Sequence, residues 1–315
     1  MLVSYSALCQ VNEHRKPVAP TKSVLAAAPA FNLDTIHQIV DAHMIHLSRQ
    51  VESSIQLFPH ENINVHAVVN GTGMAAVTIP FLGQQVNRTL GLGMRGPVTI
   101  NDIREIENLH LAANLSPTVL LCPYADPSAL QSLAVGGYGV DSFLNIYARF
   151  LHDLPVEIDA TESPEYSFGY DTKVCRAPPT DAGMEAFIQS SVTGFKDGGR
   201  ALPVLQSLAE MAAIRTDTTL YLAKINGEIA GCGALALMET EYGRVAHMYI
   251  DSTVPWFRGR GIQRALIRAR MLDAKRLGYN FVVIHANPGV GTGRNAEKEG
   301  FRLAFTKPIF TKRSN

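Results

Sequence analysis

Apolar residues along the second half of the chain recur with the spacings of a mixed α/β protein. A helix is predicted over 261–277, because Ile262, Leu266 and Ala269 fall on one face and Gly278 ends the pattern. Strands over 219–225 and 228–238, joined by an Asn-Gly turn, form the strongest hairpin signal. We further predict strands at about 167–176, 245–253, 281–286 and 303–312, helices at 181–191, 202–215 and 295–299, and a glycine-rich loop at 195–200.

The first half repeats part of this order. Predicted helices cover 32–54, 99–113 and 128–133, and predicted strands cover 65–69, 75–79, 118–122 and 143–151. Both halves therefore contain a strand, glycines, a helix, an apolar strand, a short helix and an aromatic strand, which indicates an internal duplication. The proline-rich segment 154–181 is interpreted as a linker. We expect a flexible tail over 1–30, one lobe over 31–155 and a second domain over 156–315.

Composition excludes several protein classes. The 315 residues are 46% apolar and 18% charged, with no net charge, which is ordinary for a globular protein. No apolar run approaches the roughly 18 residues of a membrane span. The four cysteines lack a C-x-x-C spacing, so we expect reduced thiols and a cytoplasmic location, not disulfides or a metal site.

The zero net charge hides an asymmetry between the ends of the chain. Residues 244–315 carry 14 Lys or Arg against 4 Asp or Glu, a net charge of +10, so residues 1–243 carry −10. The basic region indicates an anionic partner, which is a nucleic acid, a membrane or a phosphorylated cofactor, or it is only a solvated surface. A nucleic-acid site also needs aromatic residues interleaved along a basic groove, and no such groove is evident in the sequence, so we expect no nucleic-acid partner. Since no apolar run is long enough to span a membrane, we expect no membrane partner either.

The segment from Val254 to Gln263 joins a predicted strand to a predicted helix and carries the clearest chemical signal. Gly259 and Gly261 allow backbone amides to crowd together, and the following helix adds free N–H groups and its positive dipole end. Arg258 and Arg260 lie beside them. The pattern favours a pyrophosphate-binding cradle over the alternative, a basic surface turn.

This segment resembles the acetyl-CoA-binding motif of the GNAT N-acetyltransferases, Q/R-x-x-G-x-G/A preceded by V-x-P. Arg258 and Gly261 match the motif, whereas Gln263 stands where the family has Gly or Ala. The hairpin, the strand before Pro255 and the later Gly300-Phe301 match in order and spacing. The resemblance covers about 167–312 well and about 32–151 as a degenerate copy.

The resemblance implies an α/β (α+β) fold of two GNAT-like lobes, each a mixed, mostly antiparallel splayed sheet flanked by helices, with the second lobe catalytic. Acetyl-CoA is the implied cosubstrate, and its pantetheine arm enters where the strands at 245–253 and 281–286 part. One site per chain is expected, in the second lobe. The residues expected to bind acetyl-CoA are Thr253, Val254, Arg258, Gly259, Arg260, Gly261, Ile262, Gln263, Asn287 and Asn295.

The resemblance also implies positions for the catalytic groups. Several members keep a carboxylate about eleven residues before the motif, and His247 stands there with a suitable unperturbed pKa near 6.5. Tyr249 shares its strand face and is the second candidate. The tyrosine that many members use as general acid is replaced by Ala296. A buried structural role for His247 remains the alternative to catalysis.

The predicted reaction is acetyl transfer from acetyl-CoA to a primary amine of a small molecule, by direct attack in a ternary complex. The acidic balance of the first lobe favours a cationic acceptor. The alternative is a non-catalytic acyl-CoA-binding or regulatory GNAT-like protein, and we expect a monomer or homodimer. The G-x-G-x-x-G run at 91–96 is interpreted as a turn, and His37, His43 and His46 as surface histidines of a half-buried helix, not metal ligands.

Overall fold

The computed structural model describes residues 31–69, 71, 73–154, 165–169 and 171–312, so the predicted tail over 1–30 lies outside the described residues. The helices are α1 (Leu33–Leu57), α2 (Ile100–Ala112), α3 (Pro127–Val135), α4 (Asp181–Phe195), α5 (Leu202–Ala213), α6 (Ile262–Arg276) and α7 (Gly291–Lys298), with 3₁₀ turns η1 (Pro80–Gln85), η2 (Lys196–Gly198) and η3 (Pro255–Phe257). No helix in the described part of the chain combines the length and apolar character that crossing a bilayer requires.

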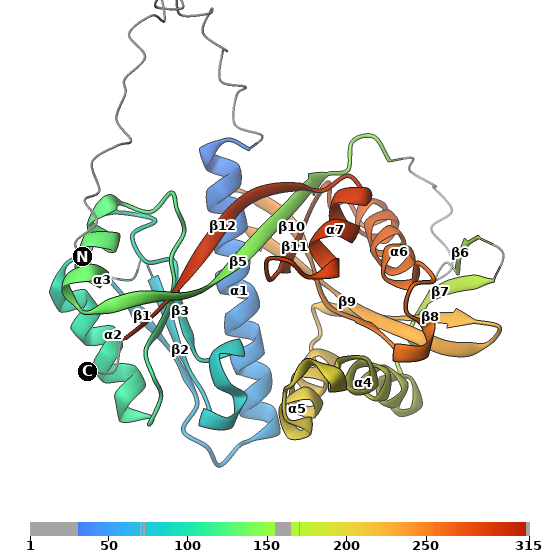
Figure 1. Cartoon of the computed structure of the whole chain (residues 1–315), viewed down its shortest axis with the longest axis horizontal. Helices are drawn as coiled ribbons and strands as arrows, with labels where there is room; N and C mark the ends of the chain where they lie inside the picture. Colours follow the sequence, from blue (N-terminus) through green and yellow to red (C-terminus); the bar gives the residue numbers. More distant parts are fainter. Residues whose placement is uncertain (1–30, 70, 72, 155–164, 170, 313–315) are drawn as a thin grey trace, which may run out of the picture. The chain divides into compact units, whose positions relative to one another are not determined.

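The strands of the described residues form one mixed sheet (Figure 1). They are β1 (Asn64–Val68), β2 (Gly73–Val77), β3 (Arg88–Leu90), β4 (Thr118–Leu120), β5 (Tyr138–Phe150), β6 (Tyr166–Phe168), β7 (Thr172–Arg176), β8 (Thr218–Ile225), β9 (Glu228–Thr240), β10 (Gly243–Thr253), β11 (Phe281–Ala286) and β12 (Arg302–Lys312). Their spatial order is β1-β2-β3-β4-β12-β5-β11-β10-β9-β8-β7-β6. Only β3/β4 and β10/β11 pair in parallel within this sheet. The predicted fold class, a mostly antiparallel open sheet flanked by helices, is confirmed.

The two halves of the chain exchange their last strands. β5 lies between β11 and β12, and β12 lies between β5 and β4, so each final strand neighbours the other half's parallel strand. Figure 1 shows β5 and β12 side by side through the middle of the sheet. The sheet is therefore continuous across the predicted boundary at 155/156, and the division into lobes stays a prediction.

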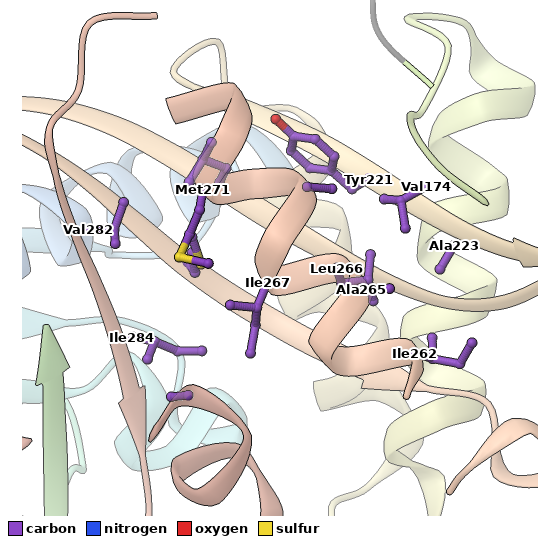
Figure 2. Close-up of a cluster of buried hydrophobic side chains, with 14 of the residues drawn as sticks. Val174, Tyr221, Ala223, Ile262, Ala265, Leu266, Ile267, Met271, Val282 and Ile284 are labelled. Atoms are coloured by element: carbon purple, nitrogen blue, oxygen red, sulfur yellow. The ribbon is translucent and has the colours of Figure 1, made fainter. Parts of the chain in front are cut away.

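Alternation along the strands distributes the helices over the two faces of the second half. Ala246, Met248 and Val282 pack with α6, whereas Val245 and Val283 pack with α1. Figure 2 shows Ile262, Leu266, Ile267 and Met271 of α6 directed into the cluster that Val282 and Ile284 complete. Burying each such side chain stabilises the fold by roughly 1.5–3 kcal/mol. Since His247 and Tyr249 alternate with Met248, they lie on the α1 face.

Local sequence explains most element boundaries. Thr99 and Asp102 form the predicted capping box of α2, and the Asn226-Gly227 turn takes positive φ angles of 50° and 87°. These features confirm the predicted start of α2 and the β8–β9 hairpin.

Some predicted elements are wrong. The single strand over 167–176 is two strands, β6 and β7, paired antiparallel around Gly169, whose φ is 66°. The loop over 195–200 is wrong at its start, because α4 continues to Phe195 and η2 follows. Neither η1 nor β3 was predicted, since β3 is three residues long and opens with Arg88.

Candidate functional site

Strand β10 is interrupted by a bulge near its end. Its antiparallel register with β9 shifts between Tyr249 and Ser252, and Ile250 takes a φ of 50°, which is strained for a β-branched residue. Parallel pairing with β11 covers 246–248 against 282–284 and stops there. The ends of the two strands are therefore unpaired with each other, as the family resemblance implied.

Two polar side chains, Ser252 and Arg270, hold the bulge in place through hydrogen bonds and an ion pair. Ser252 donates to the carbonyls of Ser190 and Ser191 in α4, at 3.2 and 3.3 Å. The buried Arg270 of α6 donates to the carbonyls of Ala234 (2.9 Å) and Tyr249 (3.5 Å) and forms an ion pair with Asp251. Burial raises the pKa of Asp251, and the Arg270 pair opposes that effect. A paired and bonded guanidinium of this kind holds the irregular backbone in place.

The loop before α6 leaves a helix N-terminus open. Gly259 and Gly261 have φ angles of 79° and 82°, and a Cβ atom on either would meet no other atom within 4 Å. Gly261 is the N-cap and supplies no side chain to the helix, so the amides of residues 262–264 lack intrahelical partners. Free amides, open space and the helix dipole together suit an anion such as pyrophosphate.

A cleft of about 640 Å³ lies over this helix end. Of the residues predicted to bind acetyl-CoA, it is lined by Thr253, Arg258, Gly259, Gly261, Ile262, Gln263 and Asn295. Arg264 and Lys298 also line the cleft and were not among the predicted residues. Arg264 lies in α6 and Lys298 in α7, and a single basic residue in a helix is not in itself a sequence signal for a binding site.

Three predicted residues lie elsewhere. Asn287 lines a neighbouring cavity. Val254 is buried and donates its amide to Ala230. Arg260 places its guanidinium over the Phe257 ring, 5.5 Å from the centroid.

Gln263 and Arg258 bridge the cleft walls. Gln263, at the position that departs from the family motif, donates to Thr292 (2.9 Å) and accepts from Asn295 (2.7 Å), which ties α6 to α7. Arg258 donates to the Gly194 carbonyl at 2.8 Å and pairs with Asp197 at 3.1 Å. Both side chains therefore connect elements around the cleft.

A second cavity, of about 300 Å³, opens on the α1 face beside the bulge. It shares Asp251 and Thr292 with the cleft, so the two meet at β10. Both halves of the chain build it. Residues 31–155 contribute His43, His46, Gln50, Gln85, Arg88 and Leu144, and the second half contributes residues of α4, α5, β10 and β11 with the loop that follows β11.

Four histidines pack together in this second cavity. The ring centroids of His43 and His285, of His285 and His247, and of His247 and His46 are each 4.4 Å apart. The prediction of surface histidines on the first helix is wrong for His43 and His46, which are 2% and 4% exposed because α1 lies against β10 and β11. Within the described residues, no set of three or more His, Cys, Asp or Glu side chains is arranged to hold a metal ion.

Burial keeps these histidines neutral. It lowers the pKa of His247 to about 3, with help from the charge of Arg215, and lowers the pKa values of His43, His46 and His285 well below the usual range. The ordinary pKa assumed for His247 from the sequence is therefore wrong, since that value ignores burial. Its Nδ1 is buried and has no hydrogen-bond partner.

Tyr249 is held as a neutral phenol. Burial raises its pKa to about 12, and its hydroxyl shares a hydrogen bond of 2.9 Å with Thr218. Its ring lies under the Arg215 guanidinium at 5.5 Å and against His46 at 4.6 Å. This side chain can donate a proton or a hydrogen bond but is a poor base near pH 7.

Comparison with known proteins shows which sequences and folds this chain is similar to. The sequence model of the Acetyltransferase (GNAT) family matches residues 189–293, which run from α4 through the glycine loop into α7. No curated protein sequence matches the chain.

Two solved structures resemble the fold over most of the chain. A GCN5-related N-acetyltransferase from Kribbella flavida has a TM-score of 0.58 at 12% identity, covering 88% of this chain and 96% of that one. A functionally unknown conserved protein from Staphylococcus epidermidis has a TM-score of 0.52 at 14% identity, covering 82% and 98%. Residues 189–293 of this chain therefore match the Acetyltransferase (GNAT) family, and the fold over most of the chain is similar to that of a GCN5-related N-acetyltransferase.

Proposed function

We propose that the protein transfers an acetyl group from acetyl-CoA to a primary amine of a small molecule, by direct attack of the amine in a ternary complex. The observation that carries this proposal is the meeting of two cavities at the bulge of β10. One holds an open helix N-terminus and the other is lined by buried polar side chains. Two substrates bound in them would have their reacting groups side by side.

On the cofactor side, the amides of residues 262–264 bind the pyrophosphate, and Arg264 and Lys298 add positive charge at the cleft wall. The unpaired ends of β10 and β11 admit the pantetheine arm. The bulge turns backbone amides near Ile250 away from the β9 ladder. An amide freed there donates to the thioester oxygen, where negative charge develops in the tetrahedral transition state.

On the acceptor side, His247 receives the proton of the attacking amine at Nδ1, the buried atom without a partner. Because its pKa is lowered to about 3, His247 is neutral and able to accept, but it is a weak base. His46 and His285 contact its ring and extend a neutral path for the proton. Tyr249, a neutral phenol beside them, donates a proton to the CoA thiolate that leaves when the tetrahedral intermediate breaks its C–S bond.

The cavity volume supports a small acceptor. About 300 Å³ is at the lower end of the range for small-molecule pockets, about 300–1,000 Å³. The cytoplasmic location and the monomeric or homodimeric state expected from the sequence stay predictions.

The test is thiol release from acetyl-CoA, measured with a panel of primary amines and without an acceptor. Release that requires an amine, with the acetylated amine found by mass spectrometry, is the expected result. Tight acetyl-CoA binding without release for any amine would instead favour the non-catalytic alternative, an acyl-CoA-binding or regulatory protein. Absence of both binding and release would overturn the proposal.

A further inference from the structure

Two arginines line the cavity that the proposed function assigns to the acceptor. Arg88 comes from β3 and Arg200 from the segment before α5. Asp251 is the one carboxylate among the described lining residues, and Arg270 already neutralises it. Neither Arg88 nor Arg200 forms an ion pair within the described part of the chain. The cavity therefore has uncompensated positive charge.

Arg88 is the more costly of the two to leave without a counter-ion. Its side chain is half-buried, its Nε is buried without a hydrogen-bond partner, and burial lowers its pKa to about 10. A guanidinium with that pKa stays charged near pH 7. Desolvating an unpaired ion destabilises the fold, and a bound anion would offset much of that effect.

On these observations, and resting on the proposed acetyl transfer, we propose that the acceptor is a primary amine that also carries an anionic group, and that Arg88 and Arg200 bind that group. The planar guanidinium fork matches a carboxylate or a phosphate with two parallel hydrogen bonds. An amino acid is the simplest molecule that has both groups at this size.

The cavity lining also offers a hydrogen-bond acceptor for the amino group of such a ligand. Gln50 Oε1 is buried, has no partner and lies in the same cavity, so it offers an acceptor for an N–H group. The expectation of a cationic acceptor from the net charge of −10 over residues 1–243 is not supported locally, because the lining residues from 31–155 include no acid. Contacts inside the cavity outweigh screened charges on the surface.

An anion at Arg88 would also assist the proton transfer. The pKa of His247 is lowered by burial, then by the charge of Arg215, and then by that of Arg88. A ligand anion beside Arg88 opposes the last of these effects and raises the proton affinity of His247 when the acceptor is bound. The substrate would thus strengthen its own base.

The experiment compares matched acceptors. Each of a panel of amino acids is assayed beside its carboxamide and its decarboxylated amine, and O-phosphoethanolamine beside ethanolamine. We expect kcat/KM to be about 10–100-fold higher for the anionic member of each pair, the range for a charged hydrogen-bonded contact. The amino-acid and phosphate pairs separate a carboxylate site from a phosphate site.

Substitutions test which arginine causes the preference for anionic acceptors. Arg88→Gln should lower the anionic preference by about 10-fold or more, and Arg88→Lys, which keeps the charge but loses the fork, should lower it less. Arg200→Gln tests the exposed arginine and remains informative if Arg88→Gln fails to fold. Arg104→Gln in α2, away from both cavities, is the matched control and should leave the preference unchanged.

Three outcomes decide the matter. Equal kcat/KM for anionic and neutral amines would overturn this inference and leave acetyl transfer intact. A rise in the calorimetric Kd for acetyl-CoA in Arg88→Gln, with the amine preference unchanged, would also overturn it by assigning the arginine to the cofactor. If no amine is acetylated, binding of the amine-free carboxylates in the presence of CoA still tests the anion site, and Arg88→Gln must weaken it.

Discussion

Two segments of this chain run strand, glycine loop, helix, strand and short helix, yet only one leaves an anion site open. In the second half, β10 leads through Gly259 and Gly261 into α6, whose N-cap has no side chain to contribute. In the first half, β3 leads through 91–99 into α2, whose Thr99 and Asp102 bond to each other's amides at 3.4 and 2.7 Å. The positive end of α2 is thus already satisfied by a carboxylate.

Space differs as well as hydrogen bonding. A Cβ on Gly259 or Gly261 would meet nothing within 4 Å, whereas one on Gly93 would lie 2.9 Å from the Ala129 side chain. The Gly93 carbonyl also accepts the amide of Asp126 at 2.7 Å, which seals the first loop against α3. Similar topology therefore does not make an anion site; unpaired amides and room beside them do.

The largest effect is expected from closing the open segment. Gly261→Asp should weaken acetyl-CoA binding by about 100-fold or more, because a carboxylate at the N-cap repels the phosphates and fills their space. Gly261→Asn keeps the shape without the charge and tolerates positive φ, so its loss should be smaller. Calorimetric Kd values measure both. Gly96→Asp, at an open glycine of the first loop, is the control, and a comparable loss there would contradict the comparison.

A second prediction contrasts two buried histidines. His247→Ala should lower kcat by about 10²-fold, the low end for general base catalysis, because a base of pKa about 3 is weak. His110→Ala, in α2 of the first half, removes another buried histidine and should leave kcat unchanged. Because His247 is neutral from pH 5 to 8, the loss should be constant over that range. A loss that vanishes below pH 6.5 would indicate an ordinary pKa and refute this account.

The histidine cluster that joins the two halves should make the fold acid-sensitive. Its folded-state pKa values lie below the unfolded value near 6.5, so the unfolded chain binds more protons and stability falls as pH drops below that value. Arg88, Arg215 and Lys307 face the cluster and add to the effect.

Each histidine contributes up to about 1.4 kcal/mol per pH unit to this slope. His247→Gln should flatten the denaturant-derived slope between pH 6 and 5 by about that amount. The exposed His60→Gln is the matched control and should leave the slope as it is. A wild-type stability that does not change between pH 6 and 5 would contradict the burial of the cluster.

The smallest effect is expected from opening the closed segment. Thr99→Ala removes the cap of α2 and should lower the free energy of unfolding by about 1 kcal/mol. It should not create a second acetyl-CoA site, because the Ala129 side chain of α3 still occupies the space beside Gly93. Chemical denaturation and calorimetry measure the two quantities. A gain of binding would show that capping alone distinguishes the two segments.

Local signals explain which elements of the second half the sequence predicted correctly. The Asn226-Gly227 turn, the apolar face of α6 and the glycines at 259 and 261 are short-range features that fix their own structure. The glycine-loop signal and the family resemblance together marked half of the residues that line the cleft, because most of those marked are near-consecutive positions of one loop and one helix.

The second cavity, which we propose for the acceptor, was not predictable in this way. Its lining joins α1 and β3 to β10 and β11, and residues such as His43 and His285 come together only when α1 packs on the sheet. Arg88 lies on a three-residue strand without apolar alternation, so no pattern marked it. The pKa of His247 likewise depends on burial by a distant helix.

We propose that one of the two segments, and only one, binds acetyl-CoA. The calorimetric stoichiometry of acetyl-CoA titrated into the full chain decides between one binding segment and two. We predict one molecule per chain. Two equivalent sites per chain would contradict the account, because the capped and filled segment at α2 would then bind as the open one does.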